Sequence, residues 1–109
     1  MKTSEIKFTV TLDDNKIPEK IQWEAADSGI TGKKNCDAML LAVWDSKENT
    51  TMRIDLWTKE MPVDDMKRFF FETMMSMADT YLRATEDKLN AEEIRKFSQS
   101  FAKKVELFQ

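Results

Sequence analysis

The stretch that decides the fold is residues 50–71, which read TTMRIDLWTKEMPVDDMKRFFF. Up to Thr58, apolar and polar residues alternate, which is the pattern of a strand with one buried face. After Pro62 the apolar residues recur every three or four positions, and Asp64 and Asp65 lie where the first turn of a helix favours carboxylates. The sequence therefore predicts a change from strand to helix at Pro62.

Three further strands are expected before this point, each joined to the next by polar residues. Residues 5–12 and 20–25 alternate as half-buried strands do, whereas residues 37–45 contain an apolar run, AMLLAVW, that predicts burial on both faces. Residues 26–35 hold both glycines and are expected to form the only long loop. Residues 50–58 complete a set of four consecutive strands.

Two helices are expected after Pro62, the first running to about residue 85. Asn90-Ala91-Glu92-Glu93 is typical of a capping box, with Asn90 as the N-cap of the second helix and Glu93 at its third position. The second helix carries a single apolar stripe: Ile94, Phe97, Phe101, Val105 and Phe108. The predicted fold class is α+β, with a four-stranded antiparallel sheet followed by two helices packed on it, in a single domain of residues 1–109.

The first helix has two apolar stripes, although a surface helix needs only one. The stripe with the larger side chains is assigned to the core: Met66, Phe70, Thr73, Met77, Tyr81 and Ala84. The other stripe then faces outward, and it is predicted to form an oligomer or partner interface together with side chains of the last two strands. The predicted interface residues are Met39, Leu41, Val43, Trp57, Phe71, Met75, Ala78 and Leu82. Self-association is favoured over a client-binding surface, and the two are compatible.

The residue inventory argues against catalysis. Histidine is absent, which removes the commonest general base and the commonest metal ligand. Cys36 has no histidine to activate it, and it is interpreted as a small buried residue. Asp64 and Asp65 point in different directions on a helix and are interpreted as first-turn charges. No enzyme activity, cofactor or metal site is expected.

Charge and targeting signals limit the partners and the compartment. A net charge of -3 argues against nucleic acids and anionic membranes, which require a basic surface. The longest uncharged stretch, residues 38–44, is too short to span a membrane, and the N-terminal residues do not resemble a signal peptide. A single cysteine is typical of a reducing compartment, so a cytoplasmic location is expected.

Two segments carry a resemblance to a known family. Residues 43–49 (VWDSKEN) and 53–67 (RIDLWTKEMPVDDMK) closely resemble the GldC family of gliding motility proteins of Bacteroidota, and residues 4–12 and 76–80 are similar as well. The resemblance implies a small accessory protein of the gliding apparatus, a system tied to type IX secretion, with no catalytic residues. The order of strands and helices is also similar to SecB-type export chaperones, tetramers that hold unfolded clients, by analogy of topology alone.

The leading hypothesis is thus a cytoplasmic, non-enzymatic accessory protein of gliding motility that acts through protein contacts, as a homo-oligomer. Two alternatives remain open. The first is a SecB-like holdase for exported proteins, whose clients would be unfolded chains. The second is a small-molecule binding domain, with Trp23, Trp44 and Trp57 lining a pocket between the sheet and the helices.

Overall fold

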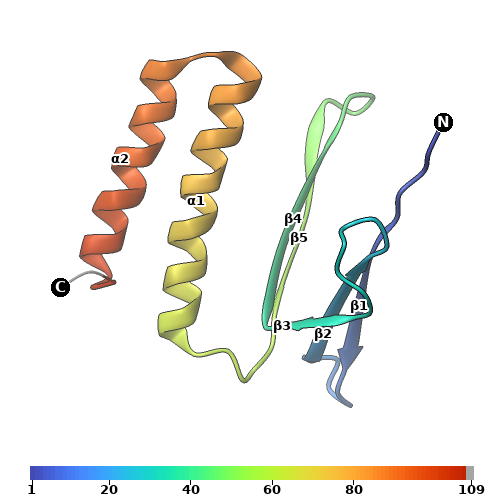
Figure 1. Ribbon diagram of the computed structural model, residues 1–109. Coiled ribbons are helices and arrows are strands. Elements are labelled where there is room, and N and C mark those ends of the chain that lie inside the picture. The colour runs from blue at the N-terminus through green and yellow to red at the C-terminus, as the bar shows by residue number, and fades with distance from the viewer. Residues whose placement is uncertain (108–109) are drawn as a thin grey trace. The chain divides into compact units, whose positions relative to one another are not determined.

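The computed structural model describes residues 1–107 and divides the chain into two compact units. The first unit, Met1–Met61, contains all the strands, and the second begins at Pro62 and contains both helices. Figure 1 shows the elements in chain order. The change from strand to helix therefore occurs at Pro62, as the sequence predicts. The prediction of a single domain, with the helices packed on the sheet, stays a prediction.

The strand unit contains five strands in two sheets. β1 (Ile6–Leu12), β2 (Pro18–Ala25) and β3 (Lys34–Cys36) form an antiparallel three-stranded sheet in that order. β4 (Ala38–Asp45) and β5 (Thr50–Trp57) form a separate antiparallel hairpin. The strands expected from periodicity are confirmed, but the single four-stranded sheet is wrong.

The extra strand explains the division into two sheets. β3 lies in the segment expected to be a loop, and it occupies the second edge of β2 by pairing Cys36 with Ile21 and Lys34 with Trp23. The chain bends at Asp37, and β4 then pairs with β5 alone. With both edges of β2 taken by β1 and β3, β4 cannot pair with β2 as the predicted four-stranded sheet requires.

Polar contacts connect the two sheets within this unit. Asp13, in the turn between β1 and β2, accepts hydrogen bonds from the backbone N–H groups of Asn15 and Ile17. The same carboxylate binds the Lys59 ammonium at 2.7 Å, just after β5. This ion pair lowers the pKa of Asp13 from its usual value, with backbone hydrogen bonds as further causes, and it raises the pKa of Lys59. The β1–β2 turn is thereby tied to the end of β5.

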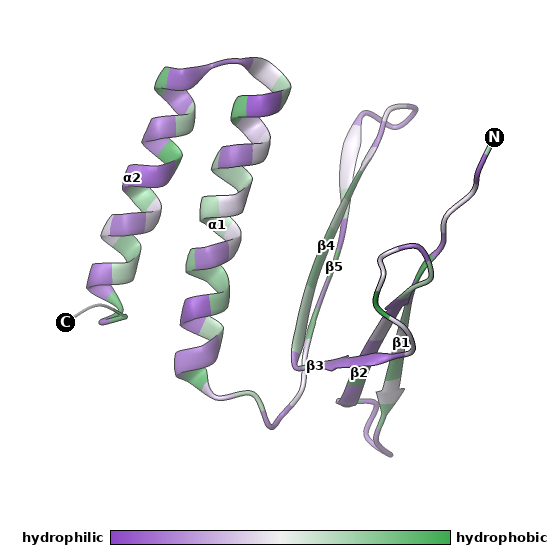
Figure 2. Ribbon diagram, in the orientation of Figure 1, coloured by the Kyte–Doolittle hydropathy of each residue, from purple (hydrophilic) through white to green (hydrophobic). Residues whose placement is uncertain are grey.

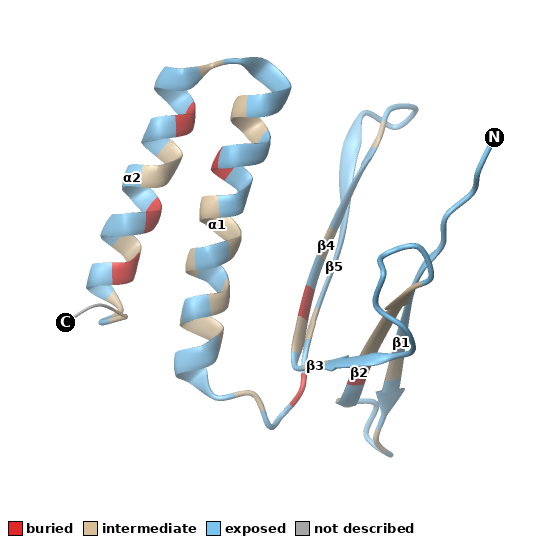
Figure 3. Ribbon diagram, viewed as in Figure 1, coloured by how far each residue is buried: buried red, intermediate tan, exposed pale blue. Residues whose placement is uncertain are grey.

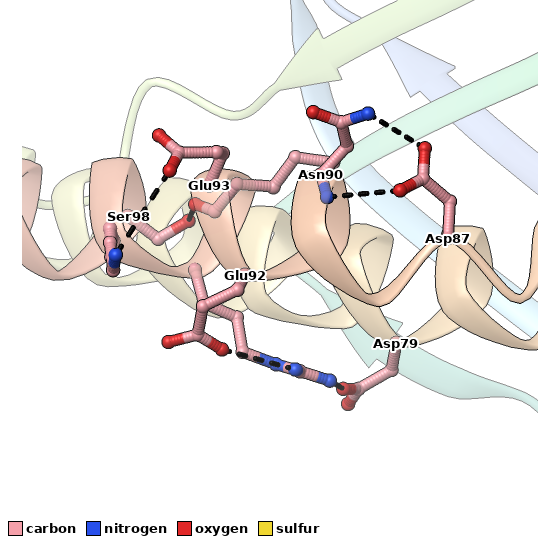
Figure 4. A network of polar contacts seen from close by, with 9 residues as sticks. Asp79, Asp87, Asn90, Glu92, Glu93 and Ser98 are labelled. Carbon is pink, nitrogen blue, oxygen red and sulfur yellow. Dashed lines mark hydrogen bonds and ion pairs between the residues drawn. The ribbon is translucent and has the colours of Figure 1, made fainter.

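The helical unit is an antiparallel hairpin of α1 (Val63–Thr85) and α2 (Lys88–Lys104). α1 ends at Glu86, which adopts a left-handed conformation and donates its N–H to the carbonyl of Leu82. The Arg95 guanidinium of α2 lies 2.6 Å from the Asp79 carboxylate of α1, so an ion pair crosses between the helices (Figure 4). The Tyr81 hydroxyl also donates to Asp87, at 2.8 Å.

The start of α2 differs from the prediction. The N-cap is Asp87, whose carboxylate accepts hydrogen bonds from the backbone N–H and the side-chain amide of Asn90 (Figure 4). Asn90 therefore lies inside the first turn, and the capping box expected from Asn90 and Glu93 is wrong. Asp87, three residues earlier, is the N-cap because its carboxylate accepts a hydrogen bond from a first-turn N–H that has no partner within the helix. These bonds, with the one from Tyr81, lower the pKa of Asp87.

Small residues form the buried seam of the helical hairpin. Among residues 62–107, those without exposed surface are Ala78 on α1 and, on α2, Ala91, Ser98 and Ala102. Figure 3 shows the buried turns of each helix on the side that faces the other helix. Of the stripe predicted for α2, Phe97 is exposed, which corrects that part of the prediction, and Phe108 lies outside the described residues.

Candidate interaction surfaces

Little apolar side-chain volume is fully buried in the described chain. The buried apolar residues are Ile21, Met39, Ala78, Ala91 and Ala102, three of which are alanines. None of the tryptophans or phenylalanines among residues 1–107 is buried. Since folding depends mainly on removing apolar area from water, exposed large side chains are the feature of this structure that most needs an explanation.

One face of the β4–β5 hairpin carries three consecutive apolar pairs, followed by the polar pair of Asp45 and Thr50 at the turn. The register pairs Met39 with Leu56, Leu41 with Ile54, and Val43 with Met52, and directly opposed residues lie on the same face. We call these six side chains the apolar face. Met39 is buried, whereas Val43, Met52 and Ile54, nearer the hairpin turn, are each more than half exposed. The exposed part of the apolar face therefore lies at the end of the hairpin nearer its turn.

The opposite face of the hairpin mixes aromatic and charged residues. Here Leu40 pairs with Asp55, Ala42 with Arg53, and Trp44 with Thr51, and Trp57 lies opposite Ala38 at the end. Trp44 is 62% exposed and Trp57 is 56% exposed. Figure 2 shows β4 as hydrophobic along most of its length. The prediction that β4 is apolar on both faces is confirmed by the register, but the structure leaves much of both faces exposed.

A shallow hollow adjoins Trp57 within the strand unit. It has a volume of about 390 Å³ and is lined by Ile17, Pro18, Asp55, Leu56, Trp57 and Lys59. Of the three tryptophans proposed for a ligand pocket, Trp57 lines this hollow. Trp23 is half-buried in β2, where it pairs with Phe8 of β1. The hollow combines an apolar wall with one carboxylate and one ammonium group.

One of the two stripes of α1 is oriented differently from the prediction. Ala78 is fully buried, and Phe71, Met75 and Leu82 of the same stripe are half-buried. In the stripe assigned to the core, Phe70 and Met77 are instead exposed. Within the helical unit Ala78 faces α2, so the outward orientation expected for Ala78 is wrong, whereas the packing of Phe70 and Met77 on the sheet stays a prediction. The physical reason is that two antiparallel helices in close contact need small residues at their seam, so side-chain volume was a poor criterion.

An exposed apolar line remains along α1. Val63, Phe70 and Met77 are spaced by seven residues, so they lie on one side of the helix, and all are exposed. The Phe70 ring contacts that of Phe69 edge to face, with centroids 6.4 Å apart. We call these three residues the outer line of α1. The interface role predicted for the eight residues named from the sequence stays a prediction.

The metal-ligating side chains and the single thiol of residues 1–107 were the candidates for chemistry. No cluster of three or more histidine, cysteine, aspartate or glutamate residues that could hold a metal ion lies within residues 1–107. Cys36 is half-buried, and its burial, followed by the charge of Asp37, raises the pKa of the thiol. A raised pKa favours the protonated thiol, which is the less reactive form. No helix in the described part of the chain is long and apolar enough to cross a membrane.

The comparisons with known proteins identify the family. The model of the family described as gliding motility-associated protein GldC-like matches residues 18–107, from the start of β2 through both helices. The chain belongs to the GldC-like family. The resemblance seen in the sequence is thus confirmed, and the match includes the β4–β5 hairpin and α1. No curated protein and no solved structure matches the chain.

Proposed function

We propose that this member of the GldC-like family is a non-enzymatic, cytoplasmic accessory protein of gliding motility that acts by binding other protein chains. The observation that carries the proposal is the contrast between a small buried core and large exposed apolar side chains on both units. Monomeric proteins rarely leave contiguous apolar patches uncovered, and such patches commonly mark protein-binding surfaces. Family membership supports the link to gliding motility.

The apolar face of the hairpin is the surface best suited to this role. Val43, Met52 and Ile54 lie side by side on two paired strands, so their positions are fixed by the ladder and not by flexible loops. Covering a large apolar side chain completely contributes about 1.5–3 kcal/mol, so a side chain that is half exposed offers a partner roughly half that value. Three adjacent side chains therefore offer a partner on the order of 3 kcal/mol before the cost of association.

A holdase for exported proteins is the second candidate, and the methionine content of the exposed surface favours it. Met52 and Met77 are both more than half exposed. Methionine side chains are flexible and polarizable, so they adapt to many apolar partners. A holdase would suppress aggregation of an unrelated unfolded protein at a stoichiometric ratio, whereas a dedicated gliding partner would be bound without that effect.

The proposal is tested by replacing Val43 and Ile54 together with threonine in the native cell. Threonine keeps the β-branched shape and the strand preference, but it places a hydroxyl on the apolar face. The matched control replaces Thr51, on the opposite face of β5, with serine. We expect both variants to keep the parental circular dichroism spectrum. We also expect the double variant alone to lose crosslinked protein partners and colony spreading.

Two outcomes of these experiments would contradict the proposal. A Val43→Thr/Ile54→Thr protein that folds, captures the same partners and supports normal spreading would show that the apolar face is not the binding surface. A deletion strain that spreads normally would remove the link between this chain and gliding motility.

A further inference from the structure

One edge of β4 has no partner in the described chain. β4 pairs with β5 on one side, and no strand among residues 1–107 pairs with its other side. Natural edge strands are usually protected from pairing by charged residues or proline, but residues 38–44 contain neither. A helix laid over a sheet covers its faces and does not satisfy the N–H and C=O groups along an edge. β5 differs because it carries Arg53 and Asp55 and contacts β2.

The register shows which backbone groups point out from this edge. The Thr58 N–H donates to the carbonyl of Asp37, directly opposite it, so this is a hydrogen-bonded pair of the antiparallel ladder. Bonded and non-bonded pairs alternate, so Met39, Leu41 and Val43 direct their backbone groups to β5. The N–H and C=O groups of the intervening residues then point away from β5: Ala38, Leu40, Ala42 and Trp44.

We propose that β4 pairs antiparallel with β4 of a second copy of this chain, so that two hairpins form one continuous four-stranded sheet about a twofold axis. The inference rests on the proposed function, in which the β4–β5 hairpin binds other protein chains, and it identifies one of those chains as a second copy. A hairpin of two strands is marginally stable in water, and sheets of three or more strands with an apolar face are stable. The outward backbone groups of Leu40, Ala42 and Trp44 in the two copies would form on the order of six hydrogen bonds.

The absence of charge on this edge lets a second copy pair with it. Two molecules that each carry a net charge of -3 repel one another, and residues 38–44, which are uncharged, add no like-charge pair to that repulsion. A twofold axis that passes beside Ala42 places Leu40 of one copy opposite Trp44 of the other. It also places Asp37 of one copy near Lys47 of the other. Centring on Leu41 would instead place Asp37 opposite Asp45, and like charges directly opposed destabilise a sheet. The Ala42-centred register, which brings the opposite charges of Asp37 and Lys47 together, is the proposed one.

A pair of proline variants tests the edge. Ala42→Pro removes an outward N–H that β5 does not use, and proline is tolerated on an edge strand in that orientation. Val43→Pro, its matched control, removes an N–H directed at β5 and is expected to disrupt the hairpin. In sedimentation equilibrium we expect a dimer or higher oligomer for the parent. We expect a folded Ala42→Pro protein whose self-association is weaker by roughly 100-fold or more. A parent that is monomeric at all concentrations, or an Ala42→Pro protein that associates like the parent, overturns the proposal.

A crosslinking experiment keeps the proposal testable if Ala42→Pro does not fold. In a Cys36→Ser background, Ala42→Cys places two thiols on directly opposed residues, whose Cα atoms are about 5.5 Å apart in such a pair. Leu41→Cys, the control, places each thiol about two residues along the strand from the thiol of the other copy. We expect oxidation to crosslink Ala42→Cys dimers at least roughly 10-fold faster. Faster crosslinking of Leu41→Cys, or none of either variant, contradicts the register and the inference.

Gliding measurements separate this inference from the proposed function. If the parent gene restores spreading to a deletion strain but its product is monomeric, the edge pairing is wrong and the proposed function stands. If the product is a β4-paired dimer but the deletion has no effect on spreading, the pairing stands and the proposed function fails.

Discussion

The burial pattern of α1 leads to a direct comparison of its two apolar stripes. Replacing Met75 and Leu82 together with glutamate introduces two charges on the half-buried side of the helix, beside the fully buried Ala78. Replacing Val63 and Met77 with glutamate introduces the same charges on the outer line, where these side chains are 71% and 57% exposed. We expect the first variant to unfold the helical hairpin and the second to stay folded.

The expected difference follows from burial. A half-buried methionine or leucine contributes roughly half of the 1.5–3 kcal/mol of a fully buried one, so losing both costs about 2 kcal/mol. Each glutamate also brings a carboxylate into a partly dry position, at about 1 kcal/mol or more. The total of about 4 kcal/mol is a large part of the 5–15 kcal/mol typical of a whole domain. On the outer line the cost should stay within about 1 kcal/mol.

Urea unfolding followed by far-ultraviolet circular dichroism measures both variants under the same conditions. The Met75→Glu/Leu82→Glu protein should have a strongly reduced midpoint or no cooperative transition, and the Val63→Glu/Met77→Glu protein should unfold close to the parent. The reverse ranking would show that the outer line is the buried side of α1, and that the stripes are oriented as the side-chain volumes had suggested.

Three further predictions concern polar residues. Asp87→Ala should lower the melting temperature by several degrees, because it removes the N-cap of α2, whereas Asp87→Asn should retain most of the cap. The Asp13–Lys59 ion pair lowers the pKa of Asp13 from 3.8, so its stabilisation is present above about pH 4 and is lost as the pH falls through the lowered pKa. Urea midpoints from about pH 5 to about pH 2 should therefore fall less steeply in Lys59→Met than in the parent. Arg53→Ala or Asp55→Ala should each change the free energy of unfolding by less than about 1 kcal/mol, since both side chains are exposed; a larger loss would show that this face of β5 is buried at an interface.

Local pattern was enough to locate most elements of this fold. Alternation identified β1, β2, β4 and β5, and Pro62 with its following aspartates identified the start of α1. β3 was missed because Lys34-Asn35-Cys36 is too short to show alternation, and it is a strand only because β2 offers an open edge. Periodicity also carries no information about which strands pair, so the division into two sheets was not predictable from it.

The candidate surfaces were predictable in part. The sequence identified β4 and α1 as carrying more apolar side chains than one buried face needs, and both elements do carry exposed apolar residues, such as Val43 and Met77. Exposed apolar residues also lie on β1, β5 and α2, which the sequence did not single out. It did not identify which stripe of α1 faces α2. That choice depends on Ala91, Ser98 and Ala102 of the other helix, which let the backbones approach at Ala78. A match between small residues on both helices would have been the better signal.

The faces and the edge of the β4–β5 hairpin make different demands on a partner, and mutations can separate them. Side chains at Val43 and Ile54 can be covered by any apolar surface, whereas the outward N–H of Ala42 is satisfied in a sheet only by another strand. A hydroxyl introduced at Val43 or Ile54 should weaken binding to the face and leave edge pairing intact, because the backbone is unchanged. Proline at Ala42 should do the opposite, because it removes a backbone donor and leaves the apolar face as it was. If the threonine and the proline substitutions each abolish both partner binding and self-association, the face and the edge are buried together in one interface. The sheet formed by the two copies is then itself the surface that binds the gliding partner.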